Sequence, residues 1–433
     1  MKKYKSYSTD KPSGVEWLGN IPEHWELRKL KFIADLIMGQ SPDSTDYNYE
    51  EIGVPFLQGT AEFGIINPNP RLSCESAKKY ARKDDLLLSV RAPVGEINVA
   101  DQVYGIGRGL CAIRPKINVF NKTFTRYFLE IGKVELVSGA TGSIYDAVTV
   151  NQVANLQCLT PPLKEQKLIA TFLDRETTRI DTLITKKCEL INLLEKKRTA
   201  IITNAVTKGL EPELPMKDSG VEWLGKVPRN WEVKKLKYIA QIVRGKFTHR
   251  PRNDPRFYDG NYPFIQTGDI SAANKYITSY QQTLNELGLS VSKEFPKGTL
   301  VMTIAANIGD LAILDFPACF PDSIVGFLPR NYCLDFLYYN LTAMKSEMVK
   351  TATLNTQMNL NIERIGGLFS ICPPIAIQKQ IATYLDKVNI RIDELIDKTA
   401  TSISELTKYR QSLITAAVTG KIDVREEVER GAA

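Results

Sequence analysis

Histidine carries much of the acid–base and metal chemistry of proteins near neutral pH, and this chain has only two histidines, His24 and His249. No His–x–x–x–His or His–Glu pair accompanies either one, so the sequence offers neither a metal site nor a Ser–His–Asp triad. A Gly–x–x–x–x–Gly–Lys–Ser/Thr phosphate loop is also absent, which argues against nucleotide hydrolysis. These absences predict a chain without catalytic activity of its own.

Three other enzyme-like patterns are weak or missing. The glycine-rich GIGRG at 105–109 lacks the strand–GxGxxG–helix setting and the downstream acid of a cofactor cradle, so it is interpreted as a turn. Pro–Asp–Ser at 42–44 and at 321–323 is not followed by an acid–x–Lys strand at nuclease spacing, and both copies are interpreted as turns. No Asn–Pro–Pro–aromatic segment of an amino-methyltransferase is present. Because nuclease signatures are loose, a nuclease with an unrecognised active site stays open as an alternative.

One segment suits binding instead. RGKFTHRPRNDPR at 244–256 sets five basic residues against a single acid, Asp254. The corresponding loop of the first half, MGQSPDSTDYN at 38–48, is polar and acidic. If both loops occupy one structural place, they recognise different partners. A solvated basic loop without a ligand is the alternative.

Side chains that read base edges occur at repeated positions. Arg pairs bidentately with guanine or phosphate, and Gln and Asn pair with adenine edges. Gln58 and Gln266 occupy the same place in two similar segments, and Arg91 faces Ala305, which lies near Asn307. A structural role is the competing interpretation for each of these residues.

An internal repeat indicates which segments of the chain form the scaffold that positions these residues. Residues 15–34 (VEWLGNIPEHWELRKLKFIA) match residues 221–240 (VEWLGKVPRNWEVKKLKYIA) at 13 of 20 positions. Residues 161–184 and 373–396 match again, at an offset of 212. The chain is therefore predicted to be a tandem duplication, in which a variable body is framed by a repeated opening and a repeated closing segment.

The closing segments are predicted to be long helices. Each follows Pro–Pro, which suits a first helical turn, and Gly209 and Gly420 are natural stops. Residues 163–207 would make about 68 Å of helix at ~1.5 Å per residue. Apolar residues recur at heptad spacing. The predicted helix-pairing residues are Leu173, Ile180, Leu194 and Ile201 in one helix, and Leu385, Ile392, Leu406 and Leu413 in the other. We favour a coiled coil that spaces the bodies apart over a separate core helix in each domain.

The bodies, about 30–155 and 235–365, are predicted to be mixed α/β. Short β-rich runs punctuated by Gly, Pro and Asn predict strands. These runs are VPFLQ, DDLLLSV and GEINVA in the first body, and TLVMTIA and LAILDF in the second. A helix at 121–137 is matched by one at 333–349.

Length and composition limit the class of protein but do not identify a function. With 433 residues, the chain is too long for one core. The net charge of +7 permits nucleic-acid binding without requiring it. Seven scattered cysteines without a CxxC pair predict buried free thiols rather than a disulfide or zinc framework. No signal segment or membrane span is recognised, so a cytoplasmic protein is expected.

The repeated motifs resemble those of the specificity subunit of type I restriction–modification systems. The resemblance rests on Ser–Gly–x–Glu–Trp–Leu–Gly–x–x–Pro–x–x–Trp, twice, and on Pro–Pro–x–x–x–Gln–x–x–Ile–Ala–x–x–Leu–Asp, twice, followed by a long helix. It implies two globular target-recognition domains separated by two antiparallel helices, with approximate twofold symmetry. It also implies a bipartite DNA target, two methyltransferase (modification) subunits and two motor–nuclease (restriction) subunits as partners. S-adenosylmethionine, ATP and magnesium would be bound by those partners, and no cofactor or metal by this chain.

This interpretation divides the chain into a first recognition domain (1–155), a central helical spacer (156–210), a second recognition domain (211–368) and a C-terminal helical spacer (369–433). The residues predicted to face DNA are Gln40, Ser41, Ser44, Gln58, Arg91, Arg108, Ser143 and Tyr145 in the first body, and Arg244, Lys246, Thr248, Arg250, Arg252, Gln266, Asn307, Asn355 and Gln357 in the second.

Because the bodies differ, the target is expected to be asymmetric, with its two half-sites about 34 Å, one DNA turn, apart. The main alternative is a tandem DNA-binding adaptor of a methylation-only system, since the difference lies in the partners. A protein–protein scaffold that binds no nucleic acid is a further alternative.

Overall fold

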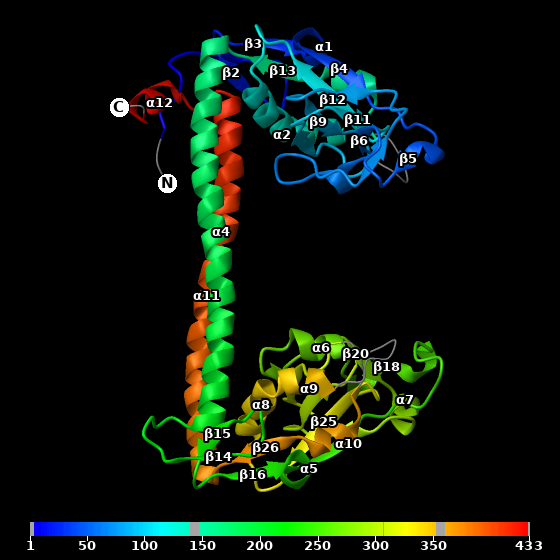
Figure 1. Cartoon of the computed structure of the whole chain (residues 1–433), viewed down its shortest axis with the longest axis vertical. Helices are drawn as coiled ribbons and strands as arrows, with labels where there is room; N and C mark the ends of the chain where they lie inside the picture. The colour runs from blue at the N-terminus through cyan, green and yellow to red at the C-terminus, as the bar shows by residue number, and fades with distance from the viewer. Residues whose placement is uncertain (1–3, 139–146, 306, 352–359, 432–433) are drawn as a thin grey trace. The chain divides into compact units, whose positions relative to one another are not determined.

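A computed structural model describes residues 4–138, 147–305, 307–351 and 360–431 (Figure 1). The chain divides into two compact units, residues 1–187 with 401–433, and residues 188–400. Each unit holds one body together with parts of both long helices, so the units cut across the four-part division expected from the sequence. Within the described ranges, no helix combines the length and apolarity that a membrane span requires.

The two long helices form as predicted. Helix α4 spans Leu163–Lys208 and helix α11 spans Ile375–Val418 (Figure 1). In unit 1, Leu173 and Ile180 of α4 share a hydrophobic core with Leu413 of α11, and Leu406 packs against that core. In unit 2, the end of α4 shares a core with the start of α11. The start of each helix thus packs on the end of the other, which confirms the antiparallel pairing.

The predicted helix-pairing residues differ in burial. Leu173, Ile180, Leu385, Ile392 and Leu413 are buried, with Ile180 the most exposed of them at 6%. Leu194, Ile201 and Leu406 are half-buried. None of the eight is exposed, so the heptad stripe follows the side of each helix that faces its partner.

The second tryptophan of each opening motif lies at the end of a long helix. Trp25 and Trp231 are buried in their units. A Cβ placed on Gly209, just past α4, would lie 3.3 Å from Trp231, and one on Gly420, just past α11, would lie 3.1 Å from Trp25. Both glycines have positive φ, +84° and +72°, which favours glycine at a helix stop. Trp231 therefore packs on the end of α4, and Trp25 on the end of α11.

The glutamine of the closing motif joins each helix to its body. Gln166 accepts a hydrogen bond from the backbone of Asn121 (2.7 Å) and donates to the carbonyl of Pro161 (2.8 Å). Gln378, 212 positions later, accepts from the backbone of Cys333 (2.8 Å) and donates to Pro373 (2.8 Å). Because both glutamines are buried, these bonds satisfy polar groups that would otherwise be costly.

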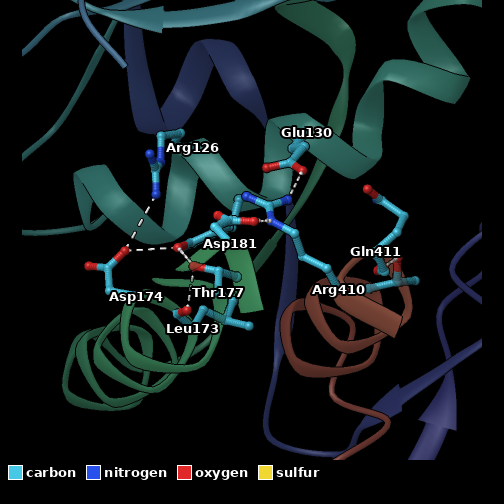
Figure 2. Close-up of polar contacts among 10 residues, drawn as sticks. Arg126, Glu130, Leu173, Asp174, Thr177, Asp181, Arg410 and Gln411 are labelled. Atoms are coloured by element: carbon cyan, nitrogen blue, oxygen red, sulfur yellow. Dashed lines mark hydrogen bonds and ion pairs between the residues drawn. The ribbon is translucent and has the colours of Figure 1, made fainter. Parts of the chain in front are cut away.

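Helix α2, Lys122–Ser138, lies against α4 in unit 1 (Figure 2). Tyr127 donates to Asp174 on α4 (2.9 Å) and lies 3.0 Å from the Thr177 hydroxyl. Arg126 pairs with the same Asp174 at 3.4 Å. Tyr339 of unit 2 repeats the Tyr127 contact by donating to Asp386 at 2.5 Å. The repeat thus preserves a body-to-helix hydrogen bond.

Body 1 contains a four-stranded and a five-stranded sheet. The four-stranded order is β10–β9–β12–β4, antiparallel throughout, and the five-stranded order is β5–β7–β6–β11–β8, in which β6 and β11 are parallel. Its strands are β4 Ala34–Met38, β5 Tyr47–Asn48, β6 Val54–Leu57, β7 Leu72–Cys74, β8 Tyr80–Ala81, β9 Leu86–Ser89, β10 Ile97–Val99, β11 Tyr104–Ile106 and β12 Leu110–Pro115. Its short helices are α1 Leu30–Ile33, η1 Ser44–Asp46, η2 Thr60–Glu62 and α3 Val150–Asn155.

Body 2 repeats this plan with changes. The orders are β17–β25–β22–β23–β19 and β20–β18–β24–β21. Its strands are β17 Ala240–Arg244, β18 Tyr258–Phe264, β19 Tyr276–Ile277, β20 Gln282–Leu284, β21 Glu294–Phe295, β22 Leu300–Thr303, β23 Leu311–Leu314, β24 Ala318–Cys319 and β25 Ile324–Pro329. Its helices are α5 Leu236–Ile239, η3 Pro255–Phe257, α6 Thr267–Ala272, α7 Glu286–Ser290, α8 Leu334–Ala343, α9 Lys345–Thr351 and α10 Ile362–Gly367.

Two-stranded pairs frame each body. These pairs are β1 Asp10–Pro12 with β2 Asn20–Pro22, β3 Glu26–Lys29 with β13 Gln157–Thr160, β14 Met216–Asp218 with β15 Lys226–Pro228, and β16 Glu232–Lys235 with β26 Phe369–Cys372. A last helix, α12 Arg425–Gly431, follows α11. Strands β3 and β16 lie in the repeated opening segments and pair with β13 and β26, which directly precede the closing segments, so each body enters and leaves its frame at neighbouring points.

Most local predictions are confirmed, and two need correction. All five predicted strands and the helix at 121–137 are present. The predicted helix at 333–349 is instead two helices, α8 and α9, because Met344 ends α8 and turns its side chain into the core. The cysteines are free, and four are buried as predicted, but Cys333 and Cys372 are half-buried and Cys188 is exposed on α4.

Candidate DNA-recognition surfaces

Body 1 carries a polar hollow of about 530 Å³. It is built by the loop after β4, the end of β6, the end of β9 and the turn between β11 and β12. Gly39 is required here, because a Cβ on it would lie 2.1 Å from the Gly107 carbonyl. The amide of Gln40 then donates to Ile106 (2.9 Å), which fixes the start of the loop against the turn.

Four predicted DNA-facing residues come together in this hollow: Ser41, Gln58, Arg91 and Arg108. Both arginines are exposed, and neither forms an ion pair with any residue that the structure describes. Two unpaired guanidiniums beside an exposed glutamine amide can donate to phosphate oxygens or to base edges. Gln40 is exposed next to the hollow, and Ser44 begins η1. Ser143 and Tyr145 lie outside the described residues.

The hollow also contains residues that the sequence prediction did not name. Asp43, Tyr47, Thr60 and Ser89 line it. Asp43 and Tyr47 belong to the polar loop at 38–48, so that loop was a usable signal for them. Ser89 ends β9 and lies two residues before Arg91 in the sequence, whereas Thr60 follows β6 and reaches the hollow only through the fold.

In body 2, the equivalent glutamine has a partner. Gln266 follows β18 as Gln58 follows β6, and its side chain donates to Gln282 Oε1 at 3.0 Å. Its backbone amide donates to Asp269 at 2.7 Å, as the amide of Gly59 donates to Glu62 at 3.1 Å. A pair of amide side chains offers both donors and acceptors, which suits an adenine edge.

By sequence alone, the five basic residues of the loop at 244–256 stand against one acid, Asp254. The structure corrects this count, because another acid, Asp322, pairs with two of the arginines. Asp322 comes from the turn before β25 and forms an ion pair with Arg252, and a longer one with Arg250 (3.6 Å). Its backbone carbonyl accepts from Arg244 Nε at 2.6 Å. Sequence alone does not connect Asp322 with the loop, because Asp322 lies 70 residues from Arg252 in the chain.

The second acid, Asp254, is held inside the loop. Arg256 donates to it at 2.7 Å and His249 Nε2 lies 3.1 Å away. Hydrogen bonds from the Arg256 side chain and backbone lower the pKa of Asp254, so its carboxylate stays ionised. The His249 ring stacks on Phe257 at 4.0 Å. His249 therefore supports the loop.

The remaining predicted residues of body 2 are less connected. Lys246 and Thr248 are exposed on the loop. Asn307 is exposed and donates to Ser271 at 3.3 Å. Asn355 and Gln357 lie outside the described residues. The loop and the Gln266–Gln282 pair thus hold most of the residues predicted to face DNA in this body.

A larger hollow, about 940 Å³, lies in unit 2 between the loop at 272–281 and the long helices. Lys275 lies at its wall, with Nζ 2.6 Å from Asp386 and 2.8 Å from Asp335. Tyr339, whose ring centroid is 5.1 Å from Nζ, completes this junction. The two basic residues that line this hollow, Lys275 and Arg198, are each paired with an acid, so the hollow is better explained as the joint between body and helices than as a DNA surface.

The comparison with a protein-family model decides the family. The model of the type I restriction modification DNA specificity domain matches residues 22–193 and again residues 228–405. The chain belongs to this family. Each matched segment contains one body and much of one long helix, which agrees with the tandem repeat.

Relatives of this specificity-domain chain have matching names. A protein provisionally assigned as the MjaX type I restriction enzyme specificity subunit of Methanocaldococcus jannaschii is 39% identical over 193 residues, which is 44% of each chain. The MjaVIII specificity subunit of the same organism is 23% identical over 437 residues, 94% of each chain. The similarity therefore reaches nearly the whole length in the second case.

Solved structures show the same fold. A chain of a type I R-M system has a TM-score of 0.74 at 18% identity, and the match covers 93% of this chain and 99% of that one. The HsdS subunit of Thermoanaerobacter tengcongensis has a TM-score of 0.52 at 17% identity, with 93% and 98% covered. The fold of a specificity subunit thus accounts for nearly all of this chain.

The other histidine, His24, belongs to a hydrogen-bonded cluster around the buried Glu165. His24 Nε2 lies 2.9 Å from buried Glu165, which also accepts from Trp25 (3.2 Å) and Tyr7. Burial and the bond to Glu165 raise the pKa of Tyr7, so it stays a neutral donor. Within the described ranges, no group of His, Cys, Asp and Glu is arranged to hold a metal ion.

Proposed function

We propose that the chain is the DNA-sequence-specificity subunit of a type I restriction–modification complex. The observation that carries this proposal is the presence of two specificity domains in one chain, with matching frames and different polar surfaces. Body 1 would read one half-site and body 2 the other. Since the surfaces differ, the target is asymmetric.

The frame supports a second part of the proposal. A repeated scaffold presents two equivalent docking surfaces, hence two copies of one partner. We propose that two methyltransferase subunits dock on the repeated segments, and that two motor–nuclease subunits join through them. S-adenosylmethionine, ATP and magnesium would be bound by those subunits. The complex would act in the cytoplasm, where its DNA substrate lies.

The experiment that tests this function maps N6-methylated adenines in the host genome with and without this gene. We expect one asymmetric, bipartite motif to lose its methylation when the gene is deleted and to regain it on complementation. An unchanged methylation pattern would reject the proposal. Purified chain with DNA and magnesium is the parallel test for a nuclease, and we expect no cleavage.

A further inference from the structure

One turn occupies the same place in both bodies. In turns 107–110 and 321–324, the amide of the last residue donates to the carbonyl of the first, at 3.0 Å and 3.1 Å. The glycine that follows β4 or β17 donates to the last residue of its turn, at 2.9 Å in both bodies. Arg108 and Asp322 are the second residues of these turns, so they are structural equivalents of opposite charge.

The surroundings of the two residues differ accordingly. Arg108 is exposed at the edge of the body 1 hollow, beside Arg91, and no described residue forms an ion pair with it. Asp322 holds Arg250 and Arg252 by ion pairs, and its carbonyl accepts from Arg244. One body presents a free cation at this turn, and the other presents an anion wrapped by cations.

The anion gives the arginines of body 2 a fixed direction. Arg250 Nη1 also donates to the carbonyls of Phe247 (2.7 Å) and His249 (2.8 Å). Its side chain is still 52% exposed, and that of Arg252 is 46% exposed. A guanidinium that is held on one edge and open on the other loses less conformational entropy when it binds. An acid facing DNA without such cations would instead repel phosphates.

We propose that this turn position determines specificity in both bodies: Arg108 contacts the first half-site directly, and Asp322 is a positioning residue that directs Arg250 and Arg252 onto the second. The ligand chemistry is the guanine edge, whose O6 and N7 accept two hydrogen bonds from one arginine. Each half-site therefore contains a G·C pair. This inference rests on the proposed function, which supplies the DNA target.

The experiment begins with the assembled methyltransferase and wild-type methylation mapping. If no methylated motif depends on the gene, the proposed function fails, whatever the role of the turn. If a motif is found, a half-site without any G·C pair overturns the inference alone. Duplexes that carry the mapped target, with each base pair replaced in turn, are then used as the binding probe.

Two variants and one control are compared on these duplexes. Arg108→Ala is expected to lose about 10-fold or more of the discrimination at one G·C pair of the first half-site, and Asp322→Ala at one of the second. In each case the other half-site keeps wild-type discrimination. Asp315→Asn is the control, because this exposed acid of body 2 pairs with Lys297 (2.8 Å) away from the arginine cluster.

The readout separates positioning from folding. A structural role for Asp322 would lower the melting temperature or weaken binding to all duplexes alike, with the ratio between base pairs unchanged. That result would overturn the inference, as would wild-type discrimination in Asp322→Ala. Selective loss at one pair, with a normal melting temperature, supports it.

Discussion

Arg410 Nε of α11 lies 3.0 Å from Asp181 Oδ1 of α4 (Figure 2). The same guanidinium donates from Nη1 to Glu130 of α2 at 3.0 Å. One side chain thus joins both long helices of unit 1 to a helix of its body. At the matching position of unit 2, 212 residues earlier, Arg198 pairs with Asp393, and Thr342 stands where Glu130 would be. Equivalent frames therefore hold their bodies by different contacts.

The first prediction follows from this difference. Arg410→Ala removes charge-assisted bonds to two helices, and we expect the opening of α2 to become easier by about 1.5–3 kcal/mol. Native-state hydrogen exchange of the α2 amides measures this. Arg198→Ala is the matched control and should leave α8 unchanged, because its ion pair connects α4 with α11 only. Equal effects of both variants on their body helices would contradict the role given to Glu130.

The second prediction concerns the helix seam. Leu194→Asp with Leu406→Asp should abolish assembly, as each places a charge in a partly buried seam. Leu173→Asp should be more damaging than either alone, because Leu173 is fully buried. Leu193→Asp is the control, since Leu193 is 61% exposed. Melting temperature by circular dichroism and co-purification with the methyltransferase are measured. Assembly of the double variant with normal target modification would rule out the spacer role.

The frame was predictable from sequence because its signals are local. Heptad spacing, Pro–Pro entries and glycine stops each act within a few turns, and both long helices follow from them. The repeat added a second copy of every signal, which predicted a pair of helices, and the resemblance to specificity subunits added that the pair is antiparallel. Even the Pro–Pro–x–x–x–Gln motif has a local cause, since Gln378 bonds to the carbonyl of Pro373 five residues before it.

The candidate recognition surfaces were only partly predictable from the sequence. Gln58 and Gln266 were proposed as DNA-facing because their shared repeat position is visible in the sequence. The ion pair between Asp322 and Arg252 could not be predicted, because it depends on strands that bring distant segments of the chain together. The equivalence of Arg108 and Asp322 was also hidden, since nothing in the residue types marks a position whose charge reverses between repeats.

The third prediction concerns pH. Burial would raise the pKa of Asp335, but the hydrogen bond and charge of Lys275 lower it below its ordinary value of 3.8. The stabilisation is therefore complete above the ordinary pKa and is lost as the pH falls through the lowered one. Lys275→Met should destabilise unit 2 at neutral pH. The difference in free energy of unfolding between this variant and wild type should shrink below pH 3.8.

Denaturant melts at several pH values between 7 and 2 measure this effect, with Lys297→Met as the control on an exposed pair. A difference between Lys275→Met and wild type that stays constant down to pH 2 would show that Lys275 acts through packing on its tyrosines alone.

The fourth prediction is modularity. Exchanging residues 30–155 for the corresponding body of another specificity subunit should change the first half-site only. The exchange points suit this, because Gln157 pairs with Lys29 in the frame and the amide of Leu30 donates to Leu156 (3.0 Å). Both ends of the inserted body then meet an intact strand pair. Methylation mapping of the hybrid is the measurement, and a changed second half-site would refute modularity.

The last prediction separates phosphate from base contacts on the basic loop. Lys246 is an exposed point charge, so Lys246→Ala should weaken binding to all sequences alike and reduce the salt slope by about one counterion. Arg250 is restrained by two backbone carbonyls, so Arg250→Ala should cost ~1–3 kcal/mol on the cognate target and relax one base pair of the second half-site. Arg244→Ala and Arg252→Ala complete the series.

Binding by the assembled methyltransferase is measured at several salt concentrations, on cognate and singly substituted duplexes. Arg256→Ala is the internal control, because its guanidinium is engaged with Asp254 within the loop. Specificity and salt dependence are independent readouts, so a variant that changes only one of them identifies its contact. Wild-type affinity, salt slope and specificity in all four variants would remove this loop from the DNA surface and leave the Gln266–Gln282 pair as the polar feature of body 2 that faces DNA.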